Sequence, residues 1–66
     1  MKLEQEVRSD RRVERLLKNP NWAVAADAAI QFLIHGTECP IASWRKSSTW
    51  AQVEMVYKEV RSRNKS

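Results

Sequence analysis

Apolar residues recur every three to four positions in three stretches of the chain, which is the spacing of an α-helix. These stretches predict helices over 3–18, 20–35 and 49–63. A shorter segment, 40–46, carries Ile41 and Trp44 three positions apart and predicts one helical turn. The pattern therefore indicates an all-α fold with three main helices and a short helical turn.

Asparagine, proline, glycine and hydroxyl residues mark the boundaries of these helices. Asn19 precedes Pro20, a pair that suits the N-cap and first position of a helix because proline has no backbone N–H to leave unpaired. Gly36 follows the second stretch, where helices commonly end in a left-handed residue. Thr49 and Gln52 have the spacing of a capping box, which predicts that Thr49 caps the last helix.

The first helix is the least regular of the three. Its apolar stripe consists of Leu3, Val7, Val13 and Leu17. Asp10 falls in the middle of this stripe, where a continuous helix would turn a charge toward the core. The periodicity favours one helix over 3–18 with a loose first turn. The alternative is a shorter helix that Ser9 or Asp10 caps.

The second helix is apolar over most of its circumference. Its broad apolar face consists of Trp22, Ala25, Ala26, Ala29, Ile30, Phe32, Leu33 and Ile34. A helix of this kind lies at the centre of a fold or at a subunit interface. The last helix is amphipathic, with a stripe of Trp50, Val53, Val56, Tyr57 and Val60.

The shortness of the chain limits how it can be stabilised. Its 66 residues predict a single domain over 1–66, with frayed ends at 1–3 and 64–66. A domain of this size buries only about 60% of its unfolded surface. Cys39 is the single cysteine and cannot form an internal disulfide, and one histidine with one cysteine cannot form a four-ligand zinc site. We therefore expect self-association as a homodimer.

Three features bear on cellular location. A lone cysteine is typical of a reducing compartment. The N-terminal residues, MKLEQEVRSDRR, contain no apolar segment of the kind that a secretory signal needs. The uncharged runs 19–26 and 28–34 are too short to cross a bilayer. These features predict a cytoplasmic protein that does not associate with a membrane.

The net charge of +4 is concentrated in the two ends of the chain, because residues 20–44 carry only two charged side chains, both acidic. The most suggestive group falls on one face of the first predicted helix and consists of Arg8, Arg11, Arg12 and Arg15. The arginine fork holds phosphate in two hydrogen bonds, so such a row could follow a nucleic-acid backbone. The alternative is a solvated face that nearby glutamates partly neutralise.

A second basic area is expected from Arg45, Lys46, Lys58, Arg61 and Lys65. Trp44 stands beside Arg45 and could stack on a base. A tryptophan in so small a domain more often packs in the core or in an interface, and this expectation is stronger for Trp22 and Trp50. The residues proposed for an interface are Trp22, Phe32 and Trp44.

The sequence lacks the residue groups that catalysis requires. His35 and Cys39 are four positions apart, but Gly36 and Pro40 interrupt any helix there, and no further ligand or catalytic partner accompanies them. A single glycine leaves no phosphate-binding loop motif. We therefore expect no enzymatic activity, no cofactor, no metal and no small-molecule substrate.

Two functions remain. The first is a small DNA-binding or other nucleic-acid-binding regulator, of a kind that phages and plasmids encode. A helix-turn-helix with its turn at Gly36 fits poorly, because Phe32 stands where a small residue is needed and the segment 41–46 is very short. The second is a protein-binding inhibitor or adaptor that uses aromatic and apolar surface on a larger partner. The positive, arginine-weighted charge favours nucleic acid.

Overall fold

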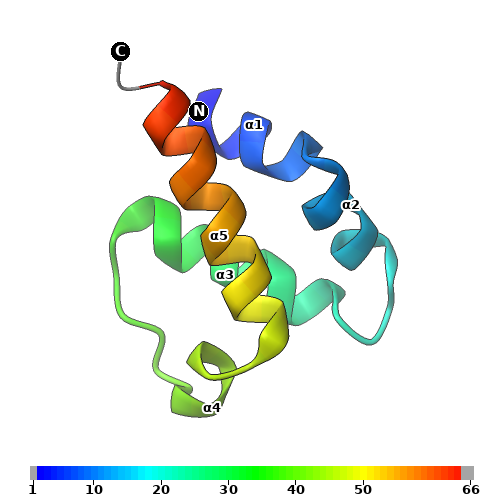
Figure 1. Ribbon diagram of the computed structural model, residues 1–66. Helices are drawn as coiled ribbons and strands as arrows, with labels where there is room; N and C mark the ends of the chain where they lie inside the picture. Colours follow the sequence, from blue (N-terminus) through cyan, green and yellow to red (C-terminus); the bar gives the residue numbers. More distant parts are fainter. Residues whose placement is uncertain (1, 65–66) are drawn as a thin grey trace.

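The computed structural model describes residues 2–64, which form helices joined by turns and contain no strand. The helices are α1 Lys2–Ser9, α2 Arg11–Lys18, α3 Ala23–His35, α4 Ala42–Arg45 and α5 Ser48–Arg63. α5 is the longest helix and crosses α3, while α1 and α2 pack along one side of the pair and α4 lies at the start of α5 (Figure 1). The all-α prediction is confirmed for this part of the chain.

The core forms where α3 and α5 meet and where α1 and α2 cover them. Its buried residues are Val7, Val13, Leu16, Ala26, Ala29, Ile30, Cys39, Trp50, Val53, Val56 and Val60. Ala26 and Ala29 are both fully buried, and their small side chains allow neighbouring helices to approach α3 closely. The predicted stripe of α5 faces the core, with Tyr57 only partly buried. In α2 the residue in the core is Leu16, and Leu17 is only partly buried.

The prediction of one helix over 3–18 is wrong, because the chain breaks at Asp10. The backbone of Asp10 is extended, with φ −65° and ψ 136°, and its side chain accepts a hydrogen bond of 2.9 Å from the Arg12 amide. Val7 and Val13 are six positions apart, which on a continuous helix would turn them about 120° away from each other. The break at Asp10 lets both valines enter the core.

The boundary at Asn19 and Pro20 was predicted correctly, but α3 begins later than expected. Asn19 ends α2, and its side-chain oxygen accepts a hydrogen bond of 2.9 Å from the Asn21 amide. Its carbonyl accepts from the amides of Trp22 and Ala23, at 3.0 and 2.8 Å. Asn19 therefore builds a closed turn over 19–22 and does not cap a helix that starts at Pro20.

The C-terminal end of α3 follows the prediction. Gly36 adopts the left-handed conformation with φ 68°, and its amide bonds to the Phe32 carbonyl. The Thr37 amide bonds to the same carbonyl at 3.1 Å. Both bonds therefore satisfy the Phe32 carbonyl, and the left-handed glycine ends the helix there.

The last helix ends at Arg63 as predicted but begins with a different cap. The side chain of Ser47 accepts the Trp50 amide at 3.1 Å, whereas Thr49 lies inside the first turn and is buried. The capping box of Thr49 and Gln52 is therefore a wrong prediction. The cap therefore lies two residues earlier than predicted, and both Thr49 and Trp50 are buried. The short helix α4 falls within the predicted segment 40–46.

The two ends of the described chain lie near each other (Figure 1). The side-chain amide of Asn64 donates a hydrogen bond of 2.6 Å to the carboxylate of Glu6 on α1. Of the ends predicted to fray, Lys2 and Leu3 already belong to α1, while residues 1 and 65–66 lie outside the described part. Between residues 2 and 64, no helix has the length and apolar character needed to span a membrane.

Candidate functional site

The four arginines predicted to form one row are divided by the break at Asp10. Arg8 belongs to α1, whereas Arg11, Arg12 and Arg15 belong to α2. Two of the four are held in ion pairs between helices, and two are exposed. The four arginines therefore do not form one row along a single helix, and the exposed pair lies on α2.

Arg8 ties α1 to α3. Its guanidinium lies 2.9 Å from the Glu4 carboxylate and 2.8 Å from the Asp27 carboxylate. Partial burial by itself would lower the pKa of Arg8, but the hydrogen bonds to Asp27 and Glu4 outweigh it and raise the pKa. With both carboxylates in place, Arg8 is a structural residue whose charge is already neutralised.

Arg12 ties the start of α2 to α5. It bonds to Asp10 at 3.0 Å and makes two bonds to the Glu59 carboxylate, at 3.0 and 3.1 Å. The hydrogen bonds to Asp10 and Glu59 raise the pKa of Arg12, and the same contacts lower the pKa of both carboxylic acids. Like Arg8, Arg12 has its charge matched by two acids.

Arg11 and Arg15 remain exposed on α2, one helical turn apart. Neither makes an ion pair or a side-chain hydrogen bond within residues 2–64. Lys18 continues the row with an exposed side chain, and its contact to Glu14 is 4.0 Å long. We call Arg11, Arg15 and Lys18 the α2 basic face. α2 carries four basic residues and one acidic residue, which makes it the most positive helix of the described chain.

The second predicted basic area is not brought together. Arg45 and Lys46 lie at the end of α4, with Arg45 3.9 Å from Glu38. Lys58 and Arg61 lie on the second half of α5, and Arg61 is 3.5 Å from the Tyr57 hydroxyl. Lys58 is ten positions after Ser48, the first residue of α5, a distance of about 15 Å along the axis.

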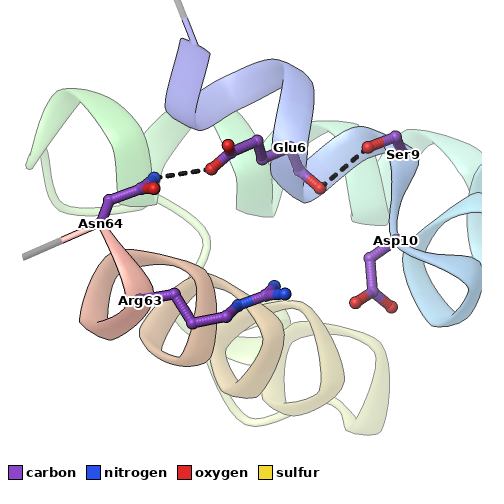
Figure 2. A pocket seen from close by; sticks show the side chains of 5 residues that line it. All are labelled: Glu6, Ser9, Asp10, Arg63 and Asn64. Carbon is purple, nitrogen blue, oxygen red and sulfur yellow. Dashed lines mark hydrogen bonds between the residues drawn. The ribbon is translucent and has the colours of Figure 1, made fainter.

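Two neighbouring depressions lie where the α1–α2 junction meets the C-terminal end of α5. The first, about 410 Å³, is lined by Glu6, Ser9, Asp10, Arg63 and Asn64. Figure 2 shows Asp10 from the α1–α2 junction and Arg63 from the end of α5 pointing into it, with hydrogen bonds from Asn64 and Ser9 to Glu6. The second, about 560 Å³, is lined by Asp10, Arg12, Lys58, Glu59, Ser62 and Arg63. Both linings mix acids with bases, so neither is selective for one sign of charge.

The aromatic residues proposed for an interface have three different environments. Phe32 is half-buried, with its ring centroid 6.4 Å from that of the buried Trp50. Trp44 is half-buried against the core, which places it as a packing residue. Trp22 is 46% exposed and does not pack against the core, so the core alternative of its expectation is wrong and the interface alternative stays a prediction. The signal for this exposure in the sequence was the pair of Asn19 and Pro20, because the turn that they begin carries Trp22.

His35 and Cys39 engage separate partners. His35 lies 3.2 Å from the side-chain oxygen of Gln31, and the buried thiol of Cys39 donates to the Ile41 carbonyl at 3.4 Å. Within residues 2–64, no three His, Cys, Asp or Glu side chains lie together as metal ligands would. The described chain therefore offers its exposed cations and Trp22 as its most distinctive surface features.

Comparison with known proteins adds no family to this picture. No protein-family model, curated protein or solved structure matches the chain. The functional argument consequently depends on the geometry of the described residues.

Proposed function

We propose that this protein is a small, non-enzymatic nucleic-acid-binding regulator that contacts the phosphate backbone through the α2 basic face. The observation that carries the proposal is that Arg11 and Arg15 are exposed on the most positive helix and have no acidic partner within the described residues. Cations without partners do not have to break an existing ion pair when they bind phosphate, so binding loses no free energy in that step. Arg8 and Arg12, in contrast, would have to give up two contacts each.

A double charge reversal tests this proposal. The change Arg11→Glu with Arg15→Glu is expected to weaken binding to a mixed-sequence DNA fragment at least about tenfold, since each charge-assisted contact contributes about 1.5–3 kcal/mol. The matched control is Arg45→Glu with Lys46→Glu, which changes the net charge equally at the α4 site and is expected to have a much smaller effect. Filter-binding titrations at low salt give both affinities.

The salt dependence of the unmodified protein provides the second readout. Three phosphate contacts by the α2 basic face predict a slope of about −2 to −3 for log affinity against log salt. If micromolar protein retains neither DNA nor RNA on the filter at low salt, the proposal fails. Equal losses in the two double variants would show that net charge, and not α2, governs binding.

A second candidate is a protein-binding module, whose partner is a larger protein or a second copy of this chain. It is favoured by two exposed apolar residues near the start of α3, Trp22 at 46% and Val24 at 69%. Exposed aromatic and aliphatic residues are common in interfaces. Size-exclusion chromatography with light scattering, run with and without nucleic acid, separates the candidates. A mass near twice 7.7 kDa that Val24→Glu reduces to that of one chain would support the homodimer.

A further inference from the structure

Trp22 is the exposed aromatic residue closest along the chain to the α2 basic face. It follows Lys18 by four residues, so their Cα atoms can be at most about 14 Å apart. The α2 basic face itself extends over about 10 Å from Arg11 to Lys18. A row of exposed cations and an exposed indole therefore occur within one short stretch of chain.

The turn that carries Trp22 is held by its own hydrogen bonds. The Asn19 carbonyl accepts the amides of Trp22 and Ala23, and the Asn19 side chain accepts the amide of Asn21. Pro20 further restricts the backbone, because its ring fixes φ. The indole is thus presented from a closed turn, and binding would require little ordering of this segment.

The elements of the fold are poorly suited to reading duplex DNA in the major groove. In the arrangement α2, turn, α3, the second helix would be the recognition helix, yet α3 contains no lysine or arginine. Two of its polar residues are engaged with α1, since Asp27 pairs with Arg8 and Gln31 donates to Glu4. α4 has only four residues, too few to follow the groove.

We propose that the surface formed by the α2 basic face and Trp22 binds single-stranded nucleic acid. The cations contact successive phosphates, and Trp22 stacks on an unpaired base. This combination of a positive track with an exposed ring is how proteins hold single strands without reading sequence, because every base offers a flat face for stacking. The inference depends on the proposed function and adds the form of the nucleic acid.

The test compares an oligothymidylate of about ten nucleotides with a duplex of the same length, each at equal salt. The protein is expected to prefer the single strand. Trp22→Ala is expected to weaken single-strand binding by about 5- to 150-fold, the range that loss of one base–aromatic stack gives. Trp22→Phe retains a ring and is expected to stay within about threefold of the original affinity. Met55→Ala removes an exposed apolar side chain from α5 and is expected to leave the single-strand affinity unchanged.

The outcomes distinguish failure of this inference from failure of the proposed function. Equal or tighter binding to the duplex, or unchanged single-strand affinity in Trp22→Ala, would overturn the single-strand assignment while leaving α2 as a phosphate-binding surface. Absence of binding to either form would remove the proposed function itself. If Trp22→Ala loses helical content by circular dichroism, Trp22→Leu replaces it, because leucine keeps apolar bulk but has no ring to stack. Equal affinities for Trp22→Phe and Trp22→Leu would then overturn the inference.

Discussion

Asp10 both caps α2 and faces a guanidinium, and substitution can separate these roles. Asp10→Ala removes the acceptor for the Arg12 amide and is expected to lower the free energy of unfolding by about 1 kcal/mol, the usual cost of losing an N-cap. Asp10→Asn keeps a good capping side chain and is expected to lower the free energy of unfolding by much less. Urea unfolding followed by circular dichroism measures both values. If the two variants lose equally, the contact of Asp10 with Arg12 matters more than the cap.

The ion pairs of the basic residues could be predicted from the sequence only in part. The identity of every arginine was available, and so was the i, i+4 pair of Glu4 with Arg8. The sequence did not indicate the acid from another helix that pairs with Arg8 or with Arg12. These acids, Asp27 and Glu59, approach the arginines only after the helices pack. Charge neutralisation across helices depends on tertiary structure, so sequence could not tell Arg8 and Arg12 from Arg11 and Arg15.

Gly36 sets the end of α3 through its backbone conformation. At φ 68°, a residue with a Cβ is strained, although a Cβ placed there would meet no other atom within 4 Å. Gly36→Ala is therefore expected to cost about 1 kcal/mol of unfolding free energy from the backbone alone. Gly36→Asn should cost less, since asparagine tolerates the left-handed region better. Equal unfolding midpoints for all three proteins in urea would contradict this account.

Helix ends were predicted more reliably than helix starts. Gly36 and Arg63 end their helices where the sequence indicated, because a left-handed glycine and a weakening apolar pattern act locally. At the start of a helix, several nearby residues can serve as the cap. Asp10 caps α2, and the break there allows both Val7 and Val13 to be buried. Ser47, not Thr49, caps α5, and Trp50 is buried in its first turn. Those choices depend on burial across helices, which a linear pattern does not specify.

At the scale of the whole molecule, the contacts of Arg12 with Asp10 and Glu59 link stability to pH. These contacts lower the pKa of both acids in the folded protein. Their stabilisation is fully present above the unfolded-state values, about 3.9 for Asp and 4.3 for Glu, and is lost as the pH falls through the lower folded-state values. The unfolding free energy is therefore expected to be level above about pH 5 and to decline below about pH 4.

Arg12→Gln provides the control for this pH dependence. It removes the cation that lowers the pKa values of Asp10 and Glu59. The variant should therefore be less stable near neutral pH, and its unfolding free energy should fall less on acidification. Urea unfolding at a series of pH values gives the two curves. Parallel curves for the original protein and Arg12→Gln would show that other acids cause the decline.

The three tryptophans lie at three depths, with Trp50 buried, Trp44 half-buried and Trp22 exposed. The intrinsic fluorescence of the protein is consequently a sum of three environments. A water-soluble quencher reaches Trp22 first, so its early effect reports on the turn after α2. The shift of emission to longer wavelength on unfolding comes mainly from Trp50, whose ring leaves Phe32 for water. The chain thus carries separate optical reporters for its surface and for its core.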